Sequence, residues 1–202
     1  MTAITVLGLH RGGTSAIAGV LHHLGVHMGD DLLPPSPHNP KGYFEDRKFV
    51  ELHDQIIGDW KDPQVDFEPY REAYTALIRE REQQHELWGI KDPRMCFVFP
   101  HFAEIAHDVH VISVGRDPDD CAKSLFARGG HTLEEATRIS NSYLGRMWII
   151  LSRFHGPVLD VRYDYLIDCP EGVVLGIAAY VGLEPTQEAI DFVDPTLCHH
   201  RR

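Results

Sequence analysis

The segment from Gly8 to Ser15, with the sequence Gly-Leu-His-Arg-Gly-Gly-Thr-Ser, is the feature that most restricts the fold of this chain. It follows an apolar run from Ala3 to Leu7 and precedes a helical pattern from Thr14 to about Leu24. A glycine-rich loop between a strand and a helix brings several backbone N–H groups and a helix N-terminus to one point, which suits an anion. The sequence therefore predicts a phosphate-binding type of loop in an α/β protein.

This loop differs from the nucleoside triphosphatase form, G-x-x-x-x-G-K-[ST], in its cation. Gly8, Gly13 and Ser15 keep their places, but Thr14 replaces the lysine that contacts the β- and γ-phosphates. The cation is instead Arg11, inside the loop. An arginine presents a planar fork to phosphate or sulfate oxygens, whereas a lysine acts as a point charge. The loop is therefore expected to bind an anionic nucleotide other than a triphosphate with Mg²⁺.

Apolar strand-like runs alternate with helical patterns along the chain. Strands are expected at Ala3–Leu7, Leu87–Lys91, Val109–Val114 and Val158–Arg162. The helices expected after the first are Arg47–Gly58, Tyr70–His85, Phe97–Ala106, Pro118–Ala127, Leu133–Phe154, Glu171–Val181 and Thr186–Val193. Alternation of this kind predicts a three-layer α/β/α fold around a parallel sheet of four to five strands, with ligands beyond the carboxyl ends of the strands.

Composition limits the organisation and the partners. With 202 residues and 43% hydrophobic content, residues 1–202 are expected to form a single domain. The first residues lack a secretion signal and the 4 cysteines are scattered, which predicts a cytoplasmic protein with free thiols and no membrane span. A net charge of −11 disfavours nucleic acid and other polyanions. The 14 histidines show no metal-ligand spacing, so no metal is expected. The oligomeric state stays open.

Two further strand ends carry cations where a ligand would lie. Arg116 follows the third strand, and Asp117 and Pro118 indicate a helix start in which Asp117 is the N-cap. Ser124 comes eight residues after Arg116, about two helical turns away, so both could hold one phosphate group. Lys91 ends the second strand, before Asp92-Pro93-Arg94.

These motifs resemble those of the sulfotransferases. The loop from His10 to Ser15 is similar to their 5′-phosphosulfate-binding loop, and Arg116 with Ser124 resembles their 3′-phosphate-binding motif. Residues 39–45, 88–94 and 162–166 are similar to patterns of the bacterial branch and to the strand exit of the family. Two phosphate motifs in the right order at strand ends make this resemblance specific, and it covers residues 3–197.

The resemblance implies that 3′-phosphoadenosine 5′-phosphosulfate (PAPS) donates a sulfuryl group to an acceptor hydroxyl or amine. No metal is needed in this family. The residues that it assigns to donor binding are His10, Arg11, Gly12, Gly13, Thr14, Ser15, Arg116, Ser124 and Tyr163. The sequence departs from the family at Gly12, where serine is common, and it lacks the glycine-rich C-terminal element that contacts the 3′-phosphate in the animal cytosolic enzymes. Arg201 and Arg202 are candidates to replace that element.

The chemistry requires a base and a stabiliser of developing charge. Arg11 is the first candidate for charge stabilisation and Lys91 the second. Glu45 is the candidate base, although an acidic residue here could instead serve only as an anion at a helix N-terminus. His53 lies eight residues further along, on the same helix face, and is the substitute base. His10 is expected to be a positioning donor.

Two alternatives stay open on the sequence alone. A nucleotide or small-molecule kinase, or a non-catalytic nucleotide-binding protein, could use the same architecture, although Arg11 with Thr14 favours the sulfotransferase. The acceptor could be a sugar, a lipid headgroup, a small alcohol or a natural-product hydroxyl. Residues 28–43 and 129–143 are expected to shape its pocket, because loops of this kind vary independently of the donor chemistry.

Overall fold

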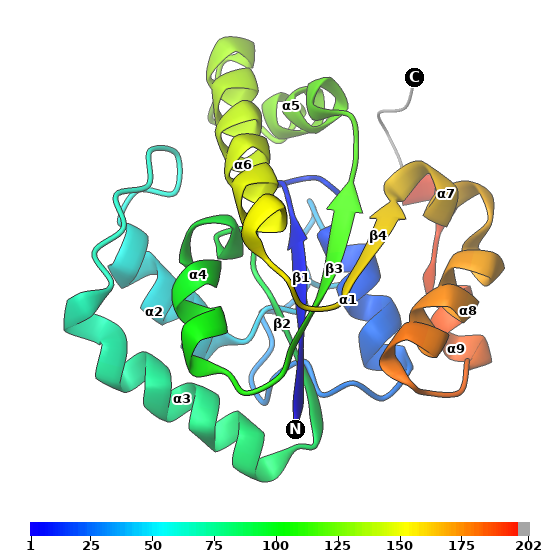
Figure 1. Cartoon of the computed structure of the whole chain (residues 1–202). Coiled ribbons are helices and arrows are strands. Elements are labelled where there is room, and N and C mark those ends of the chain that lie inside the picture. Colours follow the sequence, from blue (N-terminus) through cyan, green and yellow to red (C-terminus); the bar gives the residue numbers. More distant parts are fainter. Residues whose placement is uncertain (198–202) are drawn as a thin grey trace.

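The computed structural model describes residues 1–197, and its centre is a four-stranded parallel sheet (Figure 1). Its strands are β1 (Thr2–Gly8), β2 (Leu87–Lys91), β3 (Val109–Gly115) and β4 (Val158–Arg162), arranged in the order β2-β1-β3-β4. The central position of β1 places the loop after it in the middle of the carboxyl edge of the sheet. The predicted fold class is therefore confirmed.

Helices cover both faces of this sheet (Figure 1). The helices are α1 (Thr14–His23), α2 (Arg47–Ile57), α3 (Arg71–Gln84), α4 (Met95–Ile105), α5 (Pro118–Ala127), α6 (Leu133–Arg153), α7 (Tyr163–Asp168), α8 (Pro170–Val181) and α9 (Gln187–Phe192). Two short 3₁₀ turns, at Glu68–Tyr70 and Pro195–Leu197, complete the elements of the described part. None of the helices in residues 1–197 combines the length and the apolar character needed to cross a bilayer.

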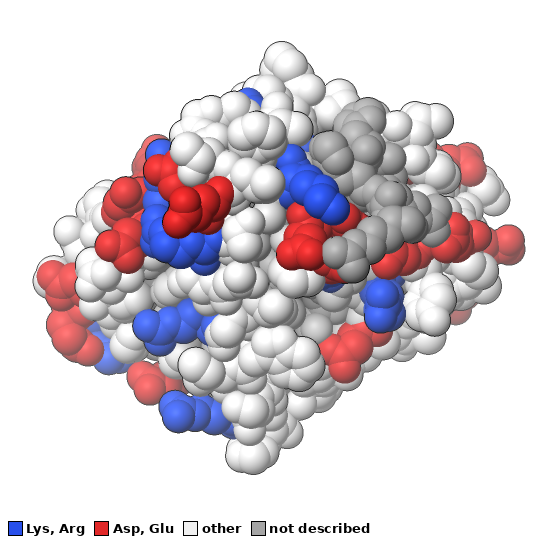
Figure 2. Space-filling model, turned by 90° about the horizontal axis from the view of Figure 1, so that it is seen from above, with Lys and Arg blue, Asp and Glu red and all other residues white. Residues whose placement is uncertain are grey.

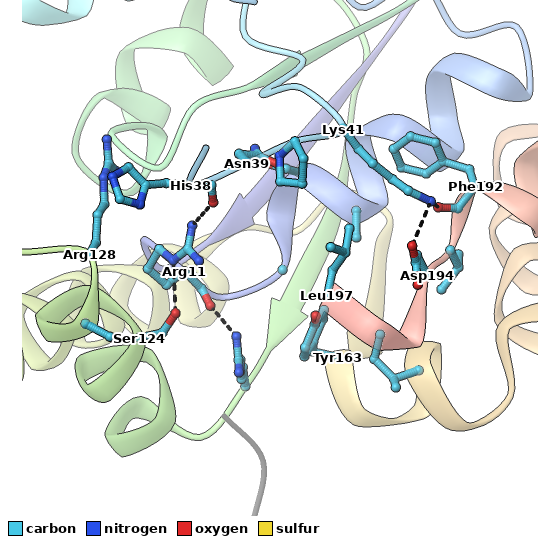
Figure 3. Close-up of a pocket in the computed structure, with 18 of the residues that line it drawn as sticks. Arg11, His38, Asn39, Lys41, Ser124, Arg128, Tyr163, Phe192, Asp194 and Leu197 are labelled. Atoms are coloured by element: carbon cyan, nitrogen blue, oxygen red, sulfur yellow. Dashed lines mark hydrogen bonds and ion pairs between the residues drawn. The ribbon is translucent and has the colours of Figure 1, made fainter. Parts of the chain in front are cut away.

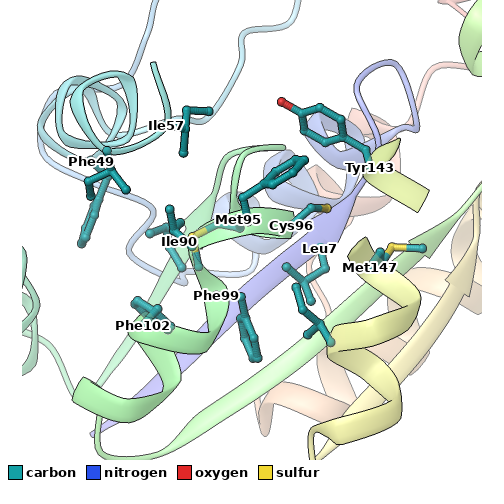
Figure 4. Close-up of a cluster of buried hydrophobic side chains, with 14 of the residues drawn as sticks. Leu7, Phe49, Ile57, Ile90, Met95, Cys96, Phe99, Phe102, Tyr143 and Met147 are labelled. Atoms are coloured by element: carbon teal, nitrogen blue, oxygen red, sulfur yellow. The ribbon is translucent and has the colours of Figure 1, made fainter. Parts of the chain in front are cut away.

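The alternation of strand side chains explains the two covered faces. Successive residues of a strand point to opposite faces of the sheet. In β1, Ala3 and Leu7 belong to the hydrophobic cluster under α2, α3, α4 and α6, and Figure 4 shows Leu7 among the rings and aliphatic chains of that cluster. Ile4 and Val6, one residue out of phase, belong to the cluster under α1, α8 and α9. Because both faces are buried, the strand is mostly apolar, with Thr5 as its buried polar residue.

The predicted helix boundaries agree with the structure to within about two residues, and local capping explains several of them. Asp117 accepts a hydrogen bond from the backbone N–H of Asp119 (2.8 Å), with Pro118 at the first helical position, as predicted. Thr132 and Glu135 form a reciprocal capping box that begins α6.

One helix was missed. Residues Tyr163–Asp168 fold into α7, where the sequence indicated only a strand exit. A helix of 6 residues is too short to show an amphipathic period in sequence. Helix α7 affects the site, because it directs the ring of Tyr163 toward Gly13 in the loop after β1.

The cysteines of the described residues are free thiols, as predicted. Cys96 and Cys121 are buried, and Cys169 is exposed. Burial raises the pKa of both buried thiols to about 12, so neither forms a thiolate near neutral pH. Cys198 lies outside the described residues.

Candidate active site

The loop between β1 and α1 has a conformation that its glycines permit. Gly13, the N-cap of α1, has a φ of 92°, and a Cβ at this position would lie 2.1 Å from Cδ2 of Tyr163. Arg11 also adopts a positive φ of 63°. No side chain caps the start of α1, and its first turn contains no acidic residue. The helix N-terminus therefore presents its positive end and its first N–H groups to a ligand.

Arg11 lies on one side of the site, between Ser124 and the loop that carries His38 (Figure 3). Its Nε donates to Oγ of Ser124 (3.0 Å), and one terminal nitrogen donates to the carbonyl oxygen of His38 (2.8 Å). Burial, followed by the nearby charges of Arg128 and Arg116, lowers the pKa of Arg11. Three guanidinium groups thus gather in this region, which is costly without an anion between them and favours one that bridges them.

Arg116 belongs to the same group, as the sequence predicted. It follows the last residue of β3 and donates to the carbonyl oxygen of Arg11 (2.7 Å). Its guanidinium carbon lies 4.6 Å from the ring centroid of Tyr163, at cation–π distance. Residues from β3, α5 and α7 therefore surround the loop after β1, although they are far apart in sequence.

These residues line one cavity of about 410 Å³, which is in the size range of small-molecule sites. Its cationic and polar side is formed by Arg11, Arg116, Ser124, Arg128 and Tyr163. The loop of residues 37–41 borders the cavity from His38, beside Arg11, to Lys41. The far side is formed by the C-terminal segment with Phe192, Val193, Asp194 and Leu197, as Figure 3 shows. Lys41 joins these two segments, because its Nζ donates to the carbonyl oxygen of Phe192 (2.5 Å) and lies 3.8 Å from Asp194.

Positive charge at this end of the molecule is local. Figure 2 looks onto the carboxyl edge of the sheet, where Lys and Arg side chains are bordered by Asp and Glu. Such a mixed surface suits a small anion held by a few cations, and the net charge of −11 disfavours a long polyanion.

A second group of polar residues lies on the other side of Ser15. Nζ of Lys91 donates to Oγ of Ser15 (3.0 Å) and to Oε1 of Glu45 (2.5 Å). The side-chain nitrogen Nδ2 of Asn39 also donates to Oγ of Ser15 (3.0 Å). Burial raises the pKa of Glu45, and the neighbouring charge of Lys91 opposes that rise. The result is a buried carboxylate and a buried ammonium beside the anion-binding loop.

The two histidines proposed from the sequence lie elsewhere. The ring of His53 is fully buried, with Nδ1 2.8 Å from Oδ2 of Asp92 and Nε2 2.9 Å from the hydroxyl of Tyr74. Both ring nitrogens are thus engaged, and the carboxylate as acceptor assigns the proton to Nδ1. This arrangement buttresses Asp92, the neighbour of Lys91, and offers no ring nitrogen to an acceptor.

His10 points away from the cavity. Its ring lies 4.6 Å from that of Trp60 and 4.7 Å from that of Tyr143, and burial lowers its pKa to about 3. Of the predicted loop residues, Arg11, Gly13 and Ser15 line the cavity, whereas the described side chains that line it do not include His10 or Thr14. Gly12 is likewise outside that lining. The backbone groups of His10, Gly12 and Thr14 are therefore the part of these residues that is expected to contact a donor.

Among the residues that line the site, Arg128 and Phe192 were not named from the sequence. Arg128 was detectable, because it follows Ser124 by four residues and a helix brings such positions to one face. Asn39 and Lys41 lie in the segments 39–45 and 28–43 that the sequence pointed to, but their contacts, like that of Phe192, depend on tertiary structure. Arg201 and Arg202, named as candidate cations, lie outside the described residues.

Comparison with known proteins agrees with the resemblance to sulfotransferases seen in the sequence. A search of curated proteins finds no match. The structure resembles the sulfotransferase domain of an olefin synthase from Synechococcus PCC 7002 (16% identity, TM-score 0.63), covering 98% of this chain and 86% of that one. It also resembles sulfotransferase STF1 from Mycobacterium tuberculosis H37Rv (19% identity, TM-score 0.62, 95% and 70% of the two chains).

A sugar kinase from Janibacter sp. HTCC2649 shares the fold as well, with 14% identity, a TM-score of 0.50 and 99% of each chain covered. Identities this low establish the fold alone, and the fold hosts more than one function. The sequence itself decides between a sulfotransferase and a kinase, since the model of the sulfotransferase family matches residues 3–188. The chain therefore belongs to the sulfotransferase family, whose members are PAPS-dependent transferases.

Proposed function

We propose that this protein transfers the sulfuryl group of PAPS to a hydroxyl or amine of a small acceptor, such as a carbohydrate or lipid headgroup. The observation that supports this most is the set of residues that share one cavity. Arg11 lines it together with Arg116, Ser124 and Arg128, and Ser15, which lines the same cavity, contacts Lys91. This arrangement supports a donor nucleotide held at the cations, with its reacting group near Arg11 and Lys91.

The residues present fit a nucleotide with phosphate groups at two positions. The start of α1 and the loop N–H groups suit the 5′ side, while Arg116, Ser124 and Arg128 suit the 3′-phosphate. The chemistry that the donor supplies is an activated sulfuryl group, whose bond to the bridging phosphate oxygen breaks as the bond to the acceptor forms. The leaving product is adenosine 3′,5′-bisphosphate.

Glu45 is proposed as the base, in preference to His53. Its raised pKa makes the carboxylate a better proton acceptor than an ordinary glutamate, and Lys91 beside it helps to keep it ionised in the resting enzyme. The acceptor proton moves to a carboxylate oxygen of Glu45. Arg11 and Lys91 donate hydrogen bonds to the oxygens on which negative charge develops.

A kinase reading is disfavoured by the buried position of Thr14. Thr14 is 4% exposed at the start of α1 and supplies no charge where a triphosphatase has its lysine. The test is a thermal-shift titration with adenosine 3′,5′-bisphosphate without metal and, separately, with ATP and Mg²⁺. We expect stabilisation by the bisphosphate of about 2.7 kcal/mol at a hundredfold excess over Kd. Stabilisation by ATP with Mg²⁺ alone would contradict the proposal.

A substitution at Arg116 tests the assignment of the 3′-phosphate. Arg116→Ala is expected to weaken binding of adenosine 3′,5′-bisphosphate roughly ten- to over a hundredfold, because a charge-assisted contact contributes ~1.5–3 kcal/mol. Binding of adenosine 5′-monophosphate, which lacks the 3′-phosphate, should hardly change. Both affinities can be measured by isothermal titration calorimetry.

The matched control is Arg162→Ala. Arg162 is an exposed arginine at the end of the neighbouring strand β4 and pairs with Asp164. It should leave both affinities unaltered. Since Arg116 also donates to the carbonyl oxygen of Arg11, equal weakening for both nucleotides would show that Arg116 acts by holding the loop.

A further inference from the structure

Three potential metal ligands meet at the edge of the sheet opposite the active site. His27 forms a bridge with Trp88 at the beginning of β2, and its carbonyl oxygen accepts from the N–H of Gly89 (2.8 Å). His85 follows the last residue of α3, just before the same strand. Asp30 comes three residues after His27. Lys91, in the active site, lies at the other end of β2, so this cluster is separate from the proposed reaction.

The three side chains are close enough to share one ion. One possible ligand atom from each of His27, Asp30 and His85 lies within 4.8 Å of the other two. Nε2 of His27 is 3.3 Å from Oδ1 of Asp30, yet this nitrogen is buried and has no hydrogen-bond partner among the described residues. A buried imidazole nitrogen without a partner is costly, and a ligand that it can bind would remove that cost.

The carboxylate of Asp30 is oriented by a buried arginine. Arg81, which is 1% exposed, donates to Oδ2 of Asp30 (2.5 Å) and to Oδ2 of Asp46 (2.6 Å). The contact with Arg81 leaves the other oxygen, Oδ1, on the side of His27. In metal sites, hydrogen-bond donors outside the coordination shell commonly orient the ligating carboxylate, as Arg81 orients Asp30 here.

The two imidazoles lie face to face, with ring centroids 3.6 Å apart and planes at 11°. Burial, and after it the neighbouring charge of His85, lower the pKa of His27. Parallel rings do not aim their nitrogens at a common point, so joint coordination requires one ring to turn. His85 is only partly buried, which leaves it room to do so.

From these contacts we propose that His27, Asp30 and His85 bind one divalent transition-metal ion of the zinc class, with water completing its coordination. Two imidazole nitrogens and one carboxylate oxygen suit Zn²⁺ and disfavour Mg²⁺, which requires oxygen ligands in octahedral geometry. The ion would connect the end of α3, just before β2, to the chain that follows α1. Its role is therefore structural, and it is independent of the donor chemistry.

The experiment uses the full chain freed of metal by a chelator and then dialysed. Zinc binding is followed by isothermal titration calorimetry, and coordination by the visible absorption of Co²⁺ in place of Zn²⁺. We expect one Zn²⁺ per chain, a rise in melting temperature with Zn²⁺ but not with Mg²⁺, and visible bands for bound Co²⁺. The variants His27→Asn and His85→Asn should each lose tenfold or more in affinity and lose the bands.

The control variant replaces His22 and His23 together with asparagine. These two rings lie 5.5 Å apart at the end of α1 and form the nearby histidine pair that could bind zinc adventitiously. The control should bind as the unmodified protein does. The proposal is overturned if zinc does not bind, if His85→Asn binds as tightly as the unmodified protein, or if only the control loses affinity. Because His85 is only partly buried, its variant is expected to fold even if that of His27 does not.

Discussion

Replacing Glu45 with glutamine is expected to reduce turnover by about 10²–10⁴-fold while leaving donor affinity nearly unchanged. Glutamine keeps the size of the side chain and an oxygen that Nζ of Lys91 can contact, but it cannot take the acceptor proton at neutral pH. The donor is proposed to be held by Arg11 and Arg116, which the substitution does not touch. Turnover, donor affinity and melting temperature should be measured on one preparation.

The pH profile separates this role from a structural one. A base must be ionised, so the rate of the unmodified enzyme should fall as the pH decreases through the pKa of Glu45. That pKa is raised by burial, which moves the acid limb above the ordinary range of a glutamate. In Glu45→Gln this limb should disappear. Glu51→Gln, an exposed substitution on α2, is the control and should keep both rate and profile.

A purely structural role of Glu45 predicts a different result. If Glu45 serves only as an anion near the start of α2, its variant should lose about 0.3–1 kcal/mol of stability and turn over almost normally. Near-normal turnover would remove Glu45 from the mechanism and return the choice to His53, whose burial between Asp92 and Tyr74 makes it the weaker candidate.

Replacing Arg11 with glutamine is expected to lower turnover by roughly 10²–10³-fold, the usual effect of removing one preorganised donor from developing charge. Glutamine can still donate to Ser124 or to the carbonyl oxygen of His38, so the loop should keep its shape. The positive charge is lost. The turnover of Arg11→Lys should lie between that of the unmodified enzyme and that of Arg11→Gln, because lysine keeps the charge but lacks the planar fork.

The control for Arg11 is Arg153→Gln at the end of α6. Arg153 is exposed, does not line the cavity and lies outside the segments expected to shape the acceptor pocket. It should leave turnover unchanged. Full activity of Arg11→Gln would show that the loop binds the donor through backbone N–H groups alone and that charge stabilisation comes from another cation.

Local patterns determined most of the fold. The four strands were predictable because each is rich in apolar residues, as buried parallel strands are. The edge strand β4 is the exception in burial, since it contains Asp160 and only Val161 is buried in it. Helix starts such as Pro118 after Asp117 follow from capping chemistry that acts over three or four residues. The short helix α7 was not predictable, since less than two turns carry no period.

The same local signals located part of the site. Arg11, Ser15, Lys91 and Arg116 each stand at the end of a strand or in the loop after it, and parallel strands end at one edge. Glu45 was a candidate from its place before a helix, but its pairing with Lys91 spans residues whose approach no sequence period encodes.

The sequence by itself determined the sheet, the glycine-rich loop after β1 and the strand-end cations, because propensity, capping and strand polarity act between near neighbours. Only the tertiary structure decided what these residues face. Packing turned the rings of His10 and His53 into the interior, brought Asn39 and Lys41 over the loop, and placed His27 against His85 at the opposite edge. Such contacts join residues far apart in the chain, and they form only where the two cores on either side of the sheet leave space for them.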